Sequence, residues 1–329
     1  MSPLKFSHRQ ILQSLLSGDK LERLPIAFWR HFPVDDQNPQ RLADATTFFH
    51  NTYDLDIIKV SPSSSFCIRD WGIIDAWNGN IEGTRDYENF LTLDEASHIE
   101  PLNPRSGNLG NQLSALRIIA ERHITDTPVI QTIFSPLSQL KNLLGKQNLN
   151  DAIRHAPAKV QSILEIITET TSRFLEECKD LQIDGIFFAV QHASSSAMSI
   201  EEFLEFGKNF DNRLFSQLSA FRMNVLHIHG KNIYFQQMLD YPCQIINWHD
   251  RETAPTLREA SSVTGKVLCG GLSRISTMVK GDKNQIETEI TDAINQMSGK
   301  NFLLGTGCVL PIIVPHGNIK HAVEFARSQ

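Results

Sequence analysis

The sequence lacks the features of a membrane protein and of a protein from an oxidising compartment. Its apolar runs fall well short of the roughly 18 residues that a membrane-spanning helix needs. Residues 1–10 lack the apolar core of a signal peptide. The five cysteines are scattered, odd in number and form no Cys-x-x-Cys pair. We therefore expect a reduced, cytoplasmic protein without a disulfide framework.

Three further absences narrow the class of protein. The net charge is -6 and there is no basic stripe, which argues against nucleic-acid binding. No Gly-x-Gly-x-x-Gly follows the first apolar run, which argues against an open dinucleotide-binding sheet. No repeat, low-complexity tract or linker divides the chain. The sequence therefore predicts one domain over residues 1–329 that acts on a small-molecule substrate.

Short apolar runs alternate with longer helical patterns along the chain. Eight such runs are the number that a closed (β/α)8 TIM barrel requires, and 329 residues are enough for one. A leading helix within residues 1–23 would close the bottom of this barrel. The expected strands are 24–29, 56–60, 129–134, 185–190, 224–228, 244–248, 267–272 and 302–306. The expected helices are 7–16, 39–53, 137–144, 151–179, 199–221, 234–239, 256–263, 284–297 and 318–326.

The spacing of the runs breaks once, between the second and third expected strands. A simple crossover needs about 12 to 30 residues, and this connection is far longer. It carries Trp71, Trp77 and the turn Asn78-Gly79-Asn80, flanked by residues that can pair as a hairpin. We interpret residues 63–128 as an insertion that covers the catalytic face.

Reactive side chains gather where the expected strands end, which is where barrel enzymes build their active sites. His227 and His229 lie two residues apart at one strand end, so both face the same way. Cys308 follows the last strand and reaches the same mouth if both strands belong to one barrel. Two imidazoles and a thiol form a soft three-ligand metal site with an open fourth position, which is a catalytic arrangement.

Other strand ends supply candidate catalytic residues, each with a structural alternative. Arg30 can clamp a carboxylate or phosphate, or pair with Asp35 or Asp36. His192 ends the fourth strand, where a lone histidine is often a hydrogen-bonded structural residue. His249-Asp250 is either a carboxylate that orients an imidazole or a rim residue paired with Arg251.

The chain resembles the superfamily that unites uroporphyrinogen decarboxylase with cobalamin-linked methyltransferases. The resemblance covers nearly the whole chain and implies the same (β/α)8 barrel. Its most specific part is similar to the family's Gly-Cys-x-x-Pro…Pro-x-x-Asn-Ile ending. The matching residues are Gly307-Cys308-Val309-Leu310-Pro311 and Pro315-His316-Gly317-Asn318-Ile319.

The decarboxylase branch is matched at only one of its five substrate contacts, Arg30. Its second arginine is absent, because His31-Phe32-Pro33-Val34 replaces that segment. The other contacts fall at or near Ser61, Asn142, Gln191 and Cys308. The resemblance therefore favours the methyltransferase branch, whose zinc motif has the form His-x-Cys…Cys. His227 and Cys308 match its ends, and His229 replaces its middle cysteine.

The resemblance implies a zinc-dependent enzyme that transfers a methyl group from a corrinoid to a thiol. Imidazole is an acceptable zinc ligand. Because histidine at position 229 is neutral where the family has a cysteine thiolate, zinc and its three ligands keep a net charge of about +1 instead of 0. No corrinoid-binding Asp-x-His-x-x-Gly segment is present, so the corrinoid would come from a partner carrier protein. Because some relatives form dimers, a homodimer is one expectation.

Other functions stay open from the sequence alone. The main alternative is a metal-free decarboxylase of a polycarboxylate such as uroporphyrinogen. Arg30 would anchor the substrate there, and a cationic pocket would stabilise the transition state. A hydrolytic zinc–water site and a non-catalytic binding protein are two more alternatives.

Overall fold

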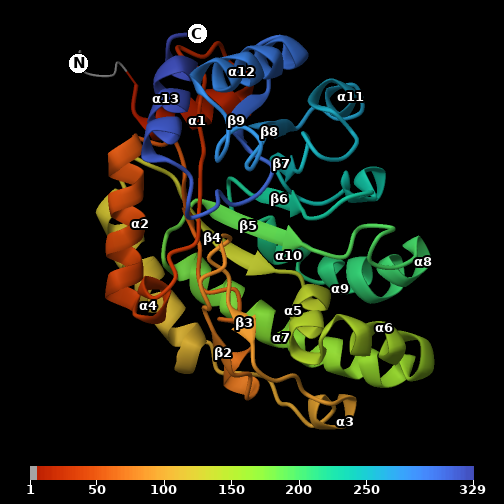
Figure 1. Cartoon of the computed structure of the whole chain (residues 1–329). Helices are drawn as coiled ribbons and strands as arrows, with labels where there is room; N and C mark the ends of the chain where they lie inside the picture. Colours follow the sequence, from red (N-terminus) through yellow and green to blue (C-terminus); the bar gives the residue numbers. More distant parts are fainter. Residues whose placement is uncertain (1–5) are drawn as a thin grey trace.

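The core of the protein is a parallel sheet, seen in a computed structural model that describes residues 6–329. Seven strands lie in the order β1-β4-β5-β6-β7-β8-β9 and curl around one core (Figure 1). All six neighbouring pairs are parallel, so the carboxyl ends of the strands gather on one side. The strands are β1 (Ile58–Val60), β4 (Val129–Phe134), β5 (Gly185–Val190), β6 (Val225–Ile228), β7 (Ile245–Trp248), β8 (Val267–Leu272) and β9 (Phe302–Thr306).

The expected first strand, 24–29, is not a regular strand. Ile26 forms only an isolated parallel bridge with Leu304 of β9. On its other side, the Ile26 carbonyl accepts a hydrogen bond from the Asp56 N–H, just before β1. Pro25 has no N–H to donate, which limits the ladder that this segment can form. The prediction of eight strands is therefore corrected to seven strands and a bridging segment.

Most of the expected helices are present, with shifted ends. The predicted helix 151–179 is divided at Pro157, which has no N–H to continue the first helix. The predicted helix 199–221 is four short pieces: α8 (Ile200–Glu202), a π-helix (Phe203–Lys208), α9 (Asn209–Asn212) and α10 (Phe215–Leu218). The expected helix 234–239 is a short 3₁₀ helix, Phe235–Met238. The remaining helices of this set are α1 (His8–Ser17), α2 (Pro39–Tyr53), α5 (Pro136–Leu144), α6 (Lys146–His155), α7 (Pro157–Asp180), α11 (Leu257–Ser261), α12 (Lys283–Met297) and α13 (His316–Arg327).

The long connection between β1 and β4 contains both the expected hairpin and a helix that the sequence analysis missed. Strands β2 (Asp75–Ala76) and β3 (Asp86–Tyr87) pair antiparallel. After the short helix α3 (Leu93–Ala96), α4 (Gly107–His123) packs beside α2 and against β4. The second half of this connection is therefore an ordinary covering helix of the sheet.

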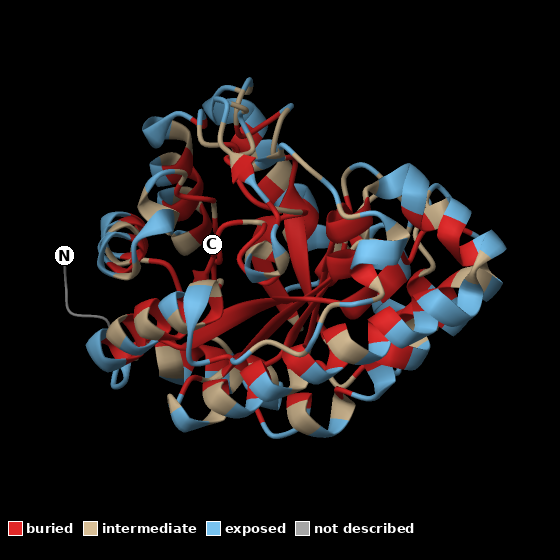
Figure 2. Cartoon of the chain, turned by 90° about the horizontal axis from the view of Figure 1, so that it is seen from below, coloured by how far each residue is buried: buried red, intermediate tan, exposed pale blue. Residues whose placement is uncertain are grey.

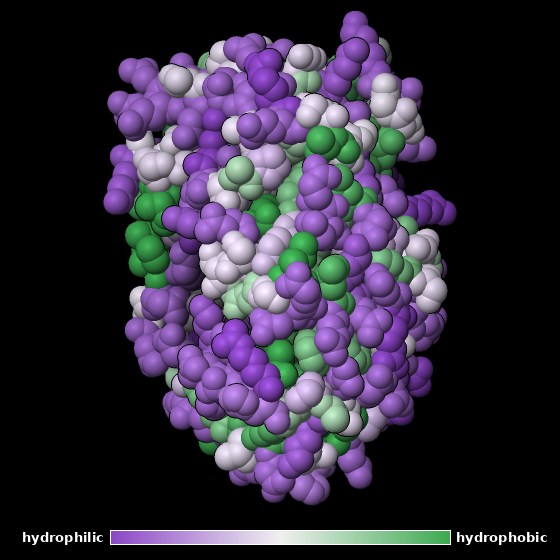
Figure 3. Space-filling view, turned by 90° about the vertical axis from the view of Figure 1, so that its right-hand side faces the viewer, coloured by the Kyte–Doolittle hydropathy of each residue, from purple (hydrophilic) through white to green (hydrophobic). Residues whose placement is uncertain are grey.

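Burial follows this layered arrangement. The strands form a buried centre, and the surrounding helices expose only their outer faces (Figure 2). Figure 3 shows the side of the molecule toward which β5 points in Figure 1, where hydrophilic residues dominate and apolar residues form small groups. No helix among residues 6–329 combines the length and the hydropathy needed to cross a bilayer. Residues 1–5 of the expected leading segment lie outside the described part of the chain.

The leading helix α1 is fixed by a buried histidine. His8 Nδ1 lies 2.8 Å from Asp56, and its Nε2 lies 3.0 Å from Asp54. Burial lowers the pKa of His8, but hydrogen bonds and charge from the two carboxylates outweigh this and raise it to about 9. The histidine is therefore positively charged at neutral pH.

This raised pKa predicts a loss of stability in mild alkali. The contribution of His8 is fully present below its unfolded pKa of 6.5 and is lost as pH rises through about 9. Between pH 6 and pH 9.5 the wild type should lose roughly 1–3 kcal/mol more unfolding free energy than His8→Gln. Urea unfolding at both pH values measures this difference. Equal losses in the two proteins would contradict it.

Candidate metal centre

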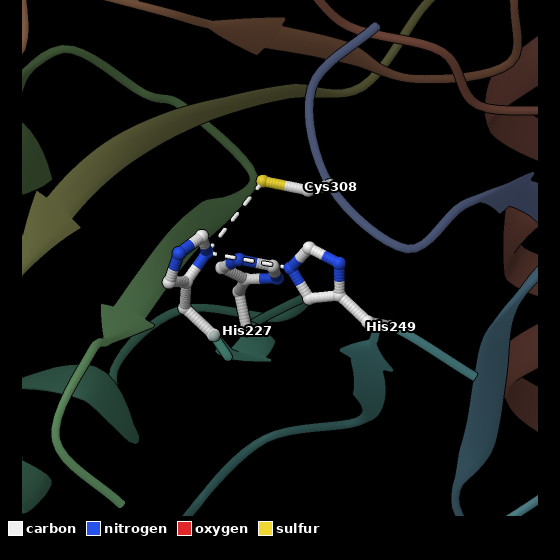
Figure 4. A group of neighbouring side chains, drawn as sticks. His227, His249 and Cys308 are labelled. Atoms are coloured by element: carbon white, nitrogen blue, oxygen red, sulfur yellow. Dashed lines mark hydrogen bonds between the residues drawn. The ribbon is translucent and has the colours of Figure 1, made fainter. Parts of the chain in front are cut away.

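Four potential ligands meet at the carboxyl ends of the strands: His227, His229, His249 and Cys308. One nitrogen or sulfur atom from each lies within 4.8 Å of the others. His227 lies on β6 and His229 directly follows that strand, His249 directly follows β7, and Cys308 lies in the loop after β9. Figure 4 shows the Cys308 sulfur and the His227 and His249 rings pointing toward one another. The structure thus brings together the three predicted metal ligands and adds a fourth group.

The spacing of these atoms fits a four-coordinate metal ion. His249 Nε2 lies 3.4 Å from His229 Nδ1, and Cys308 Sγ lies 3.8 Å from the same nitrogen. Tetrahedral bonds of about 2.0–2.3 Å place neighbouring ligand atoms roughly 3.3–3.6 Å apart. Imidazole and thiolate ligands together suit Zn²⁺. The residues present therefore fit zinc in both donor type and distance.

A glycine allows the Cys308 loop to approach the end of β7. A Cβ atom at Gly307 would lie 2.6 Å from the His249 Cα and 2.8 Å from the Trp248 carbonyl oxygen. Any side chain would therefore force the two backbones apart. Thr306 then fixes the turn, because its hydroxyl donates to the Cys308 carbonyl at 2.6 Å. This close approach explains why glycine directly precedes cysteine in the sequence motif.

The orientation of His227 is fixed by Asn247, which lies beside it on β7. The Asn247 amide nitrogen donates to the carbonyls of Cys269 and Thr306 at 2.9 and 3.0 Å. Its oxygen therefore faces His227 and accepts a hydrogen bond from Nδ1 at 2.7 Å. With the proton on Nδ1, the lone pair of Nε2 is free for the cluster. Phe187 stacks on the same imidazole at 5.3 Å between ring centres.

The cluster favours a thiolate. Burial alone would raise the pKa of the Cys308 thiol, but the charge and hydrogen bonds of the three imidazoles lower it well below its ordinary value. Burial lowers the pKa of His227. It also lowers that of His229, but the hydrogen bond to the Cys308 thiolate and the charge of that thiolate together outweigh burial and raise the His229 pKa. A thiolate among imidazoles is the ionised form that a metal ligand requires.

The partner of His249 in the sequence does not orient it. Asp250 faces away from the cluster, accepts a hydrogen bond from the Gly271 N–H at 3.0 Å and lies 3.8 Å from the Arg251 side chain. Burial raises the pKa of Asp250 to about 7. His249 belongs to the cluster, whereas Asp250 lies in the turn that follows it and contacts the backbone of β8. This contact matches the second of the two roles predicted for Asp250, a pair with Arg251.

Arg30 also lies away from the cluster. Its guanidinium is 5.4 Å from the centre of the Phe32 ring and 5.7 Å from that of Phe49 on α2. It lines a separate cavity of about 460 Å³ together with Phe48 and His316. The preceding residue, Trp29, points inward and packs edge-on against Phe187. Alternation places the next side chain on the opposite face.

His192 is buried near the cluster, at the end of β5. Burial, helped by the positive charges of Lys141 and Lys146, lowers its pKa to about 3, so the ring is neutral. Its Nδ1 has no hydrogen-bond partner among the described residues. His229 also contributes to the lowering of this pKa, so the two imidazoles interact electrostatically. The residue predicted at the end of the fourth strand thus lies near the cluster.

A buried lysine near the cluster was not among the residues predicted from the sequence. Lys59 lies on β1, inside the sheet, and its ammonium donates to the Ser61 hydroxyl at 2.9 Å. A lysine at an inward position of an apolar strand run is the signal that could have revealed it.

The hairpin loop is joined to the loop that carries Cys308. Both terminal nitrogens of Arg274 donate to the Glu82 carboxylate at 2.6 Å, and Nη1 also donates to the Val309 carbonyl at 3.1 Å. The Ile312 N–H donates to the Ile81 carbonyl at 2.8 Å. Residues that follow β2, β8 and β9 are thereby held together beside the cluster.

A curled parallel sheet with reactive side chains at the carboxyl ends of its strands is the layout of TIM-barrel-type enzymes. The chain belongs to the uroporphyrinogen decarboxylase (URO-D) family, whose model matches residues 12–329. The resemblance inferred from the sequence is therefore confirmed.

Individual relatives point to the methyltransferase branch of this family. The methylcobamide:CoM methyltransferase MtbA of Methanosarcina mazei is 18% identical over 305 residues, which cover 92% of this chain and 87% of that protein. A solved structure of a methyltransferase from Methanosarcina mazei is similar with a TM-score of 0.84 at 19% identity, covering 98% of this chain and 99% of the other. A B12-independent methionine synthase from Shewanella sp. W3-18-1, in complex with selenomethionine, has a TM-score of 0.57 at 12% identity and covers 95% and 97%. The two structural similarities show a shared fold.

Proposed function

We propose that the protein is a zinc-dependent methyltransferase that moves a methyl group from a corrinoid to a thiol. The observation that carries the proposal is the four-residue cluster, whose donors and spacing fit zinc. His227, His229 and Cys308 would hold the metal. Bound there, zinc would keep a substrate thiol ionised at neutral pH.

The remaining residues of the site would prepare this chemistry. Asn247 holds His227 in the tautomer whose Nε2 faces the cluster. His249 presents Nε2 to the same space and is our candidate for accepting the proton of the incoming thiol. A methyl-corrinoid would supply the methyl group to the substrate sulfur, and the electron pair of the broken carbon–cobalt bond would stay on cobalt.

The corrinoid would arrive on a partner. The chain has no Asp-x-His-x-x-Gly segment for binding one, and the similar protein MtbA is named for a methylcobamide donor. We further propose that the segment around Ile26 completes a (β/α)8 barrel, and that the hairpin region within residues 63–128 covers its catalytic face. The Glu82–Arg274 ion pair supports this placement, since it joins the hairpin loop to the loop after β8.

Decarboxylation of a polycarboxylate is less well supported. That mechanism needs Arg30 as an anchor inside the mouth, and its guanidinium instead lies over Phe32 and Phe49. Arg251 is also engaged, with the Gly271 carbonyl and Asp292. The inward-facing groups at the strand ends are imidazoles and a thiol, which suit a metal better than a carboxylate-rich substrate.

The direct test is an assay with methylcobalamin and simple thiols. Zinc-loaded protein should demethylate methylcobalamin in a thiol-dependent way, which is followed by the absorbance change of the corrinoid. Protein treated with a chelator should lose this activity and regain it with zinc. Uroporphyrinogen turnover without metal, together with no methyl transfer, would overturn the proposal.

A further inference from the structure

A second cavity lies outside the cluster, between α2 and the start of α13. These two helices pack side by side and cover the sheet from outside (Figure 1). The volume of the cavity, about 460 Å³, lies within the range of small-molecule sites. None of the four cluster residues lines it. The cavity is therefore a separate place where the protein can hold a ligand.

The cavity contains an arginine without a counter-ion. No hydrogen bond or ion pair among residues 6–329 reaches the Arg30 guanidinium, and its Nε atom is buried. Burial lowers the pKa of Arg30, but a guanidinium stays ionised at neutral pH. The Phe32 and Phe49 rings beneath it offset only part of the cost of burying this charge. Packing alone therefore does not favour an arginine here.

The carboxylates that line the cavity are already bound to other arginines. Asp35 lies 2.7 Å from Arg41, and Asp44 lies 2.8 Å from Arg122. The charge of Asp35 still raises the pKa of Arg30, but the two form no ion pair. The charge of Arg30 is thus left for a ligand. Because both carboxylates repel added negative charge, they favour a ligand group with a single charge over a doubly charged one.

Aromatic rings form much of the remaining wall. Phe49 packs edge-on against Phe32 and Tyr53, with ring centres 5.9 and 5.1 Å apart. Tyr53 stacks on His316 and shares a hydrogen bond with its Nδ1. Phe48 also lines the cavity and leaves 69% of its surface exposed. His316 is the first residue of α13, so the positive end of that helix dipole also lies at the cavity.

We propose that this cavity binds a small aromatic carboxylate, whose acid group pairs with Arg30 and whose ring packs against Phe48 and Phe49. A carboxylate matches the planar guanidinium with two parallel hydrogen bonds. A flat apolar body matches the aromatic wall. The inference is independent of the proposed methyl transfer, because the cavity and the cluster share no residue. Arg30 would thus bind an anion on the outer side of the sheet.

Calorimetric titration of the full chain with 2-naphthoate and with the neutral 2-naphthamide tests this inference. Wild type should bind one 2-naphthoate about 10-fold or more tightly than the amide, since charge-assisted hydrogen bonds contribute at this level. Arg30→Gln should lose this preference while it keeps its affinity for the amide. Arg258→Gln is the matched control, because it removes the same charge from an exposed residue of α11. It should keep the preference.

Phe48→Ala tests the aromatic wall and does not depend on the folding of Arg30→Gln. It should weaken the binding of the acid and of the amide alike, because the ring contacts the body that both probes share. A preference for the acid that survives in Arg30→Gln would overturn the inference, as would equal affinity of wild type for the two probes. Affinities that Phe48→Ala leaves unchanged would also contradict it.

A second copy of the chain is the other occupant that the experiment distinguishes. Analytical ultracentrifugation of wild type and Phe48→Ala measures the oligomeric state. A wild-type dimer that Phe48→Ala dissociates, together with no binding of either probe, would show that a second copy covers the cavity. That result would overturn the inference and leave the proposed function intact.

Discussion

Replacing Cys308 with alanine is expected to remove the zinc and to lower methyl transfer by about a thousandfold or more. Cys308 is the only thiolate in the cluster and offsets half of the charge of the metal. Loss of several kcal/mol of metal-based stabilisation corresponds to a rate change of this size. Metal content by elemental analysis and the methylcobalamin assay measure the two effects.

A second cysteine supplies the matched control for this substitution. Cys178 is fully buried on α7 and is not part of the cluster. Cys178→Ala removes the same atoms from a packed site, so it should cost some stability and retain both zinc and activity. Equal zinc content in Cys308→Ala and Cys178→Ala would contradict the assignment of Cys308 as a ligand.

Replacing Asn247 with leucine is expected to weaken zinc binding by about 10- to 100-fold, the usual cost of losing a group that orients a ligand. The leucine has no oxygen to accept the His227 Nδ1 proton, so the imidazole is no longer held in the tautomer that frees Nε2. The Cys269 and Thr306 carbonyls lose their donor as well. Competition with a chromophoric chelator measures the affinity.

The control here is another buried amide. Gln112 on α4 donates to Gln131 at 2.8 Å and is not a member of the cluster. Gln112→Leu should destabilise the fold without changing the zinc affinity of the folded protein. If Asn247→Leu binds zinc as tightly as Gln112→Leu does, Asn247 has no orienting role.

The sequence revealed the cluster because the relevant signals are local. The interval of two between His227 and His229 places both on one face of a strand, and the position of Cys308 after the last strand follows from the parallel order. Arg30 and Asp250 lie outside the cluster, Arg30 over Phe32 and Phe49 and Asp250 beside Arg251. Each directly follows an inward-facing residue, Trp29 or His249. To predict which way a strand-end side chain points, one must know which of its neighbours are buried, and the sequence shows burial only indirectly.

The fold was predicted less completely where tertiary contacts outweigh local pattern. The alternation of strand and helix was sufficient to predict a parallel α/β protein, but the bridge at Ile26 replaced a regular strand. Helix α4 was missed because the long connection was interpreted as a single insertion. Lys59 was missed although a lysine within the apolar run 56–60 is visible in the sequence.

The most direct measurement is the metal content and X-ray absorption spectrum of wild-type protein purified without added metal and again after reconstitution with zinc. The structure predicts one zinc per chain, bound by one sulfur and by two or three imidazole nitrogens. A chain that holds no zinc after reconstitution, or zinc with no sulfur neighbour, would contradict the assignment of this cluster as a metal centre.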